Sequence, residues 1–215
     1  GYAAKLAAPS ALNSYLLGSM GGSFVSGLDH SVWLFLLFSS AALLVLGFLR
    51  PAASSVLGKV DFALLGLLAL WPFTLAVFSF LNNKGDAFHA TDPIGHAVRF
   101  AAPLALILLS FNPNPLWQTR VDWLLRLSVA GAFIGHGLCA WWIKPSFIDL
   151  IVGTLDTLLG QDLAASVSRQ AFAEASLPVI AVQDFILVAL LLLPNRKIRT
   201  VAMWMAIWGF VTAMS

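Results

Sequence analysis

Two residues able to carry chemistry stand inside strongly apolar stretches of the sequence: His136, between two glycines, and Asp184. A carboxylate in hydrocarbon is costly unless it is paired or protonated, and an imidazole there also needs hydrogen-bond partners. The two are natural partners, because the carboxylate can orient the imidazole and stabilise its protonated form. Such a pair could pass a proton or bind a polar headgroup such as a quinone carbonyl. Gln183 and Cys139 are expected to line the same site.

The elements that must position this pair are two predicted membrane spans. His136 lies in the span predicted at 124–143 and Asp184 in the span predicted at 177–193. His136 stands seven positions before the end of its span, and Asp184 stands seven positions after the start of its span. Both of these span ends are predicted to face the same side of the membrane. At about 1.5 Å per residue, both side chains lie about 10 Å below that surface. The equal depth predicts that they meet.

The pair also has a purely structural interpretation, in which it is a satisfied contact that fixes the packing of two helices. Gly131 and Gly135 have the small-xxx-small spacing that lets helices approach closely, so we expect them to form a packing face. The sequence alone leaves both interpretations open.

A second group of polar residues, His89, Asp92 and His96, gives a weak metal-site candidate. Positions i, i+3 and i+7 share a helical face, and two histidines with a carboxylate can bind a metal. However, Asp92 followed by Pro93 is typical of a helix start, which places His89 outside the helix and favours a polar loop. A haem is not expected, because His96 and His136 lie at different depths. No covalently bound cofactor is predicted.

The composition defines the broad class. Of the 215 residues, 60% are hydrophobic and 10% are charged, whereas a soluble domain carries about 25% charged residues. We therefore expect an integral membrane protein that contacts the lipid bilayer. A net charge of +2 without lysine or arginine runs argues against a nucleic-acid partner, and a single cysteine excludes an internal disulfide.

The predicted fold is all-α, a polytopic transmembrane helix bundle. A span needs roughly 20 apolar residues to cross about 30 Å of hydrocarbon. Residues 1–31 are expected to form an extramembrane or interfacial segment, and residues 32–215 a single transmembrane domain. About six segments fit this length, namely 32–49, 62–81, 94–111, 124–143, 177–193 and 198–215.

An amphipathic helix is predicted at 146–160, lying in the membrane interface rather than crossing the membrane. Ser146 and Asp149 have capping-box spacing, and Gly160 is expected to end the helix. Asp149 and Asp156 fall on one face, which we expect to be exposed to water.

The loop charges predict an orientation. Cytoplasmic loops carry an excess of lysine and arginine. Seven of the 12 such residues flank one set of predicted loops, which favours that side as cytoplasmic and places the N-terminus outside. The expected location is a bacterial inner membrane. These seven residues are Arg50, Lys59, Arg120, Arg126, Arg196, Lys197 and Arg199.

A family resemblance runs through the segment around His136. Leu125-Arg126-Leu127, followed by Gly131, Phe133 and Gly135-His136-Gly137, resembles the first helix of DoxX-like membrane proteins. The resemblance covers roughly residues 121–215. It implies a membrane component of a redox system, in one case a thiosulfate:quinone oxidoreductase.

The resemblance also assigns places to later residues. In that family a loop or interfacial helix follows, then a span that often carries an acid; residues 146–160 and Asp184 occupy these places here. The chain departs from the family in having Cys139-Ala140-Trp141 where a lysine is usual. It also has at least three predicted spans before the match, whereas the family usually has four spans in all.

Three functions fit the sequence. The first is an accessory subunit of a respiratory-type redox complex that contributes a quinone or proton site, rather than an independent enzyme. The second is a purely structural subunit that packs against other membrane subunits. The third is a small-solute or proton-coupled transporter that uses His136 and Asp184 as its coupling pair.

Overall fold

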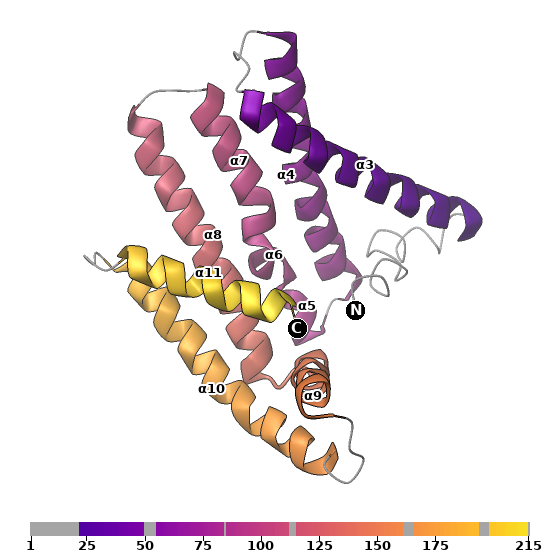
Figure 1. Ribbon diagram of the computed structural model, residues 1–215, viewed down its shortest axis with the longest axis vertical. Coiled ribbons are helices and arrows are strands. Elements are labelled where there is room, and N and C mark those ends of the chain that lie inside the picture. The colour runs from indigo at the N-terminus through magenta and orange to yellow at the C-terminus, as the bar shows by residue number, and fades with distance from the viewer. Residues whose placement is uncertain are drawn as a thin grey trace. The chain divides into compact units, whose positions relative to one another are not determined.

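The structure is a computed structural model in which residues 22–49, 55–83, 85–111, 115–160, 166–193 and 198–214 are described. Every regular element in these ranges is a helix, as the all-α prediction required (Figure 1). Residues 1–21 of the predicted N-terminal segment lie outside the described ranges, as do Arg50, Arg196 and Lys197 of the charge count. The helices are α3 (Gly22–Leu49), α4 (Val56–Asn82), α5 (Ala87–Ala90), α6 (Asp92–Gly95), α7 (Ala97–Phe111), α8 (Pro115–Trp141), α9 (Pro145–Leu159), α10 (Ser166–Leu192) and α11 (Ile198–Met214).

Four of these helices, α3, α4, α8 and α10, are long and apolar enough to cross a membrane. The protein is therefore a membrane protein by the length and composition of its helices. The predicted count of about six spans is not confirmed among the described residues, because the other two segments form shorter apolar helices. α7 has 15 residues and α11 has 17, and a helix of 15 residues is about 22 Å long.

The span predicted at 94–111 is shortened because its first residues form a separate turn. Asp92 and Pro93 start α6, as the sequence indicated, but α6 ends at Gly95. His96 then leaves the helical conformation, with φ −101° and ψ 7°, and α7 begins at Ala97.

Four helices begin six or more residues before the spans predicted in them. α3 begins at Gly22, within the predicted extramembrane segment 1–31, rather than at residue 32, and α4 begins at Val56 rather than at residue 62. α8 begins at Pro115 rather than near residue 124, and α10 begins at Ser166 rather than near residue 177. Pro178 was interpreted as part of a helix start, yet it lies inside α10. A proline inside a helix removes one backbone hydrogen bond, a loss that packing against other helices can offset in a membrane protein.

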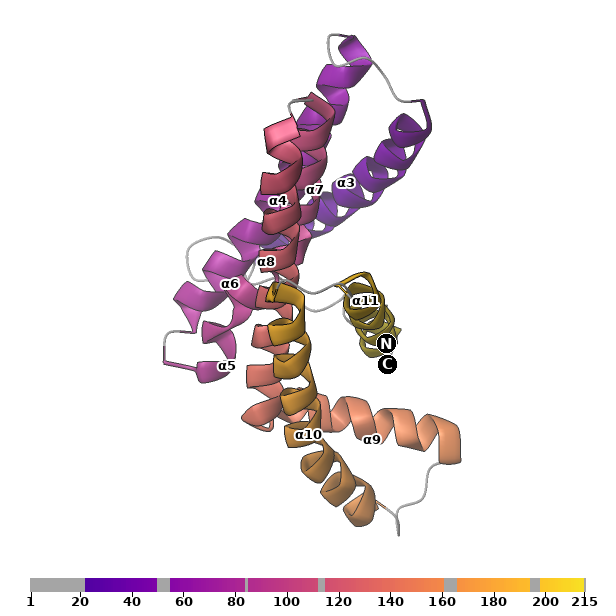
Figure 2. The same cartoon turned by 90° about the vertical axis from the view of Figure 1, so that its left-hand side faces the viewer.

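The contacts divide the chain into two compact units, Gly1–Leu125 and Arg126–Ser215. In the first unit α4 packs most extensively against α7, and the two run side by side in both views (Figures 1 and 2). The rings of Phe73 on α4 and Phe100 on α7 meet edge to face, with centroids 5.4 Å apart. Ser55 caps α4 by accepting a hydrogen bond from the Gly58 N–H at 3.0 Å.

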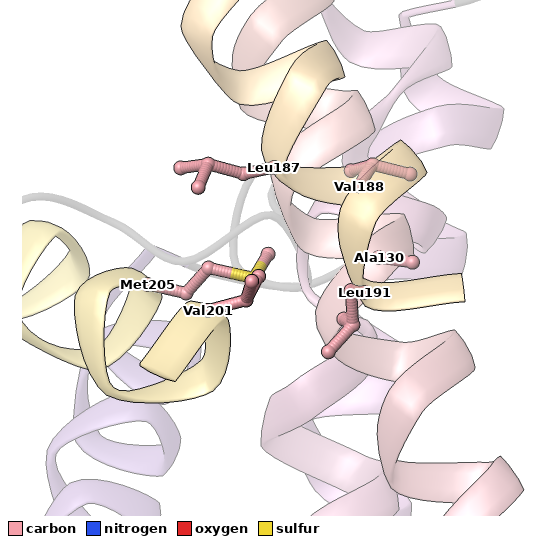
Figure 3. Close-up of a cluster of buried hydrophobic side chains, with 6 residues drawn as sticks. All are labelled: Ala130, Leu187, Val188, Leu191, Val201 and Met205. Atoms are coloured by element: carbon pink, nitrogen blue, oxygen red, sulfur yellow. The ribbon is translucent and has the colours of Figure 1, made fainter. Parts of the chain in front are cut away.

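The second unit contains the last part of α8 with α9, α10 and α11. One buried apolar cluster joins α8, α10 and α11; Figure 3 shows Leu187, Val188 and Leu191 of α10 with Ala130 of α8 and the α11 side chains. A second cluster joins α8 and α10 to the first turns of α9. Its buried members are Ala140, Leu177 and Ala181, and Phe147, Ile148, Ile151, Ile180 and Phe185 pack against them.

The predicted amphipathic helix forms as α9, one residue earlier than expected at each end, and it crosses α10 at a steep angle (Figure 2). Gly160 follows it with φ +83°, a conformation that favours glycine. Asp149 is exposed, as predicted. Asp156 is only partly exposed, because its carboxylate forms an ion pair with Arg169 of α10. Arg169 also donates a hydrogen bond to the Gly160 carbonyl at 2.8 Å.

We expect Arg169→Gln to loosen the packing of α9 on α10. An exposed ion pair contributes up to about 1 kcal/mol, but the Arg169 side chain is only 11% exposed and makes a second hydrogen bond, so a loss of about 1–2 kcal/mol is expected. The measurement is the melting temperature of the detergent-solubilised protein. Arg120→Gln, which removes an exposed arginine that stacks on Trp117, is the control. Equal melting temperatures for the two variants would contradict the expectation.

Candidate functional site

The structure brings His136 and Asp184 together inside the second unit. The imidazole Nδ1 of His136, on α8, lies 2.6 Å from Oδ2 of Asp184, on α10. An ionised carboxylate only accepts hydrogen bonds, so the Nδ1–H donates to it. This assignment leaves Nε2 of His136 as the ring nitrogen that can face a ligand.

The two members of the pair differ in burial. The Asp184 side chain is 0% exposed, whereas the His136 side chain is 30% exposed. The second carboxylate oxygen of Asp184, Oδ1, is buried and has no hydrogen-bond partner among the described residues. A buried polar atom without a partner costs free energy, and such atoms are uncommon in native structures. The site therefore has an acceptor that a bound molecule could satisfy.

A glycine lets the two helices approach at the level of the pair. A Cβ added to Gly137 would lie 2.9 Å from the ring of Phe185 and 3.3 Å from the Cβ of Asp184. The sequence predicted close packing at Gly131 and Gly135 and assigned no packing role to Gly137. Gly135 is buried and Gly131 is half-buried.

An aromatic ring from α9 covers the imidazole. The ring centroids of Phe147 and His136 are 4.7 Å apart, with 34° between their planes. Phe147 is the third residue of α9, and its N–H donates to the Lys144 carbonyl at 2.9 Å, so the turn that starts α9 sets its position. Sequence reasoning missed Phe147; the available signal was an aromatic residue at the start of an amphipathic helix that follows the His136 span.

The other two predicted site residues are both near the pair in sequence. Cys139 lies one helical turn after His136 and is 5% exposed. Gln183 precedes Asp184, and its side-chain nitrogen is buried without a hydrogen-bond partner in the part of the chain that the structure describes. Among the described residues, a buried donor on Gln183 and a buried acceptor on Asp184 therefore both lack partners, which is uncommon in native structures.

The metal-site candidate in the first unit is only partly assembled. Nδ1 of His89 lies 3.0 Å from Oδ2 of Asp92, and the Ser79 hydroxyl donates to the same carboxylate oxygen. Among the described residues, no group of three or more histidine, cysteine, aspartate or glutamate side chains is placed to hold a metal. His96 lines a cavity together with Asp92 and Ser79, and His89 is not among the lining residues.

The contacts of Ser79, His89 and Asp92 also differ from those of a hydrolase triad. A triad places the serine and the carboxylate on opposite ring nitrogens. Here the same nitrogen, Nδ1 of His89, faces Ser79 Oγ at 3.2 Å and Asp92 Oδ2 at 3.0 Å. The histidine therefore does not act as a base between serine and carboxylate, and its contact holds Asp92 in place.

The fold and the site together define an all-α membrane protein with a His–Asp pair between two of its helices, in which the aspartate is fully buried. Comparison of the chain with protein-family models, with curated proteins and with solved structures gives no match.

Proposed function

We propose that the chain is a membrane subunit of a quinone-linked redox complex and that His136 and Asp184 bind the quinone headgroup. The observation that carries the proposal is the contact of 2.6 Å between Nδ1 of His136 and the fully buried carboxylate of Asp184. Oδ1 of this carboxylate has no hydrogen-bond partner among the described residues. The resemblance to DoxX-like proteins supports the same assignment.

The residues present suit a headgroup with polar oxygens on a flat ring. Nε2 of His136 accepts a hydrogen bond in the neutral ring and donates one in the protonated ring. Among the described residues, the buried amide nitrogen of Gln183 has no acceptor and Oδ1 of Asp184 has no donor. The Phe147 ring lies beside the imidazole and provides an aromatic surface for a flat ring. A bound quinone supplies reversible two-electron, two-proton chemistry, with electrons that come from a partner subunit.

The chain's own part in this chemistry is the handling of protons. Asp184 accepts the hydrogen bond from Nδ1 of His136 and so fixes the orientation of the ring. The protonated imidazole carries a proton at Nε2, where it can be donated to a bound oxygen. The apolar surroundings of the pair strengthen both interactions, because little water competes for the hydrogen bonds.

The proposed function also implies a membrane location, an orientation and neighbouring subunits for the chain. The site lies in a bacterial inner membrane, with the N-terminus outside and other membrane subunits packed against the apolar helices. α3 fits a surface covered by lipid or by a partner, because large side chains such as Phe38 and Leu44 are each 69% exposed.

The test is the quinone content of the native protein, extracted gently and assayed by mass spectrometry. We expect the wild-type chain to retain quinone and His136→Gln to lose it by about tenfold or more, because the substitution removes hydrogen bonds to a buried polar group. His30→Gln, at an exposed residue of α3, is the matched control.

Unchanged quinone content in a folded His136→Gln protein would overturn the proposal. Partner proteins retained by wild type and variant alike, without quinone in either, would make the chain a structural subunit. Proton flux in liposomes that depends on Asp184, again without quinone, would instead make it a transporter.

A further inference from the structure

The first unit contains a cavity that the proposed redox function does not use. Its volume is about 420 Å³, within the range of roughly 300–1,000 Å³ typical of small-molecule sites. Residues of α3, α4, α6 and α7 line it. The lining combines apolar side chains, including Leu36, Trp71 and Leu75, with the polar side chains of Ser79, Asp92, His96 and Arg99. This composition suits an amphipathic molecule.

Two side chains of opposite charge line this cavity without meeting each other. Among the described residues, Asp92 and Arg99 form no ion pair, although both face the same space. Oδ2 of Asp92 is held by the Ser79 hydroxyl and by His89, so the carboxylate is a fixed negative charge. Arg99 is exposed, in the first turn of α7. A ligand that carries one positive and one negative group can satisfy both residues.

The charges argue against other classes of ligand. A quinone headgroup is uncharged and cannot compensate either residue. A purely anionic headgroup would satisfy Arg99 but would be repelled by Asp92, since like charges in a site of low dielectric disfavour each other strongly. A metal ion would need further carboxylate or histidine ligands, and the described residues hold no such group.

We propose that the cavity binds a membrane phospholipid whose headgroup carries both a phosphate and a primary ammonium. The phosphate pairs with the guanidinium of Arg99, because an arginine can make two parallel hydrogen bonds to phosphate oxygens. The ammonium donates to the fixed carboxylate of Asp92. The start of the acyl chains lies against Trp71 and Leu75, the apolar part of the lining. This site lies in the first unit and is independent of His136 and Asp184.

The test uses the full chain in detergent and native mass spectrometry with defined lipids. Phosphatidylethanolamine carries both groups, phosphatidylglycerol lacks the ammonium, and the ammonium of phosphatidylcholine cannot donate a hydrogen bond. We expect the wild-type protein to retain phosphatidylethanolamine in preference to the other two. Arg99→Gln should weaken retention of phosphatidylethanolamine about tenfold, through loss of a charge-assisted contact.

Asp92→Asn gives the second arm, because it removes the partner of the ammonium alone. We expect it to abolish the preference for phosphatidylethanolamine over phosphatidylglycerol while leaving phosphate recognition in place. The matched controls are Arg120→Gln and Asp61→Asn, which remove charges elsewhere in the first unit and should leave the preference unchanged.

Two results would overturn the proposal: equal retention of the three lipids by the wild-type protein, or a preference that Arg99→Gln leaves unchanged. Stronger retention of phosphatidylglycerol would replace it with an anionic-lipid site. Because Asp92 contacts Ser79 and His89, Asp92→Asn is first checked for an unchanged melting temperature. The exposed Arg99 makes Arg99→Gln decisive even if the Asp92 variant does not fold.

Discussion

His136→Ala will lower the melting temperature of the detergent-solubilised protein sharply, because it leaves the Asp184 carboxylate buried without its partner. Asp184 is fully buried, and its second oxygen already lacks a hydrogen bond among the described residues. Removing one member of a buried ion pair typically costs about 3–5 kcal/mol. We expect about 3 kcal/mol here, since the His136 side chain is 30% exposed and water can enter the space that the ring leaves.

Replacing both members of the pair should restore most of this loss. In the variant His136→Phe with Asp184→Leu, no charge is buried, and apolar residues of similar volume often replace a buried ion pair at no net cost. The aromatic ring at position 136 also keeps its contact with Phe147. Together with the single variants His136→Phe and Asp184→Leu, this gives a double-mutant cycle with a coupling energy of about 2 kcal/mol.

The cycle separates the structural from the functional interpretation of the pair. If the double variant is stable but retains no quinone, the pair is kept for binding rather than for packing. If it is stable and quinone content is unchanged, the proposed site is elsewhere. A His136→Ala protein as stable as the wild type would show that the contact between His136 and Asp184 is not formed in the folded chain.

Part of this site could be predicted from the sequence. The burial cost of a charged group in hydrocarbon singles out Asp184, and a count of residues from the span ends places His136 at the same depth. The depth of a residue does not fix the rotation of its helix about the helix axis. The sequence therefore could not decide whether Gly137, or the pair Gly131 and Gly135, faces α10. Phe147 was missed for a related reason, because the path of the turn before α9 decides which ring covers the imidazole.

The helix boundaries show a different limit. The predicted spans followed apolar runs, but a helix continues as long as its backbone hydrogen bonds are satisfied. α10 therefore begins at Ser166, in a polar stretch whose arginine pairs with Asp156. In contrast, the segment that starts at Asp92 is apolar enough for a span but breaks at His96. Polarity of the sequence predicted the membrane class well and the length of each helix poorly.

Gly137→Val will separate α8 from α10 at the level of the His–Asp pair. Even one added carbon would lie 2.9 Å from the Phe185 ring and 3.3 Å from the Asp184 Cβ. The ring can shift for an alanine, so Gly137→Ala should cost about 1–2 kcal/mol. Valine adds two further methyl groups next to a position that cannot move without α10, and we expect a loss of about 3 kcal/mol or more.

The same substitution should act on function as well as on stability. Moving α10 away from α8 lengthens the contact of 2.6 Å between His136 and Asp184, so a folded Gly137→Val protein should lose quinone along with thermal stability. Gly153→Ala on α9 is the matched control, because an added Cβ there meets nothing within 4 Å. It should leave quinone content unchanged and raise stability by up to about 1 kcal/mol, through the better helix propensity of alanine. If Gly137→Val behaved like this control, α8 and α10 would not approach each other at Gly137, and the geometry of the candidate site would be wrong.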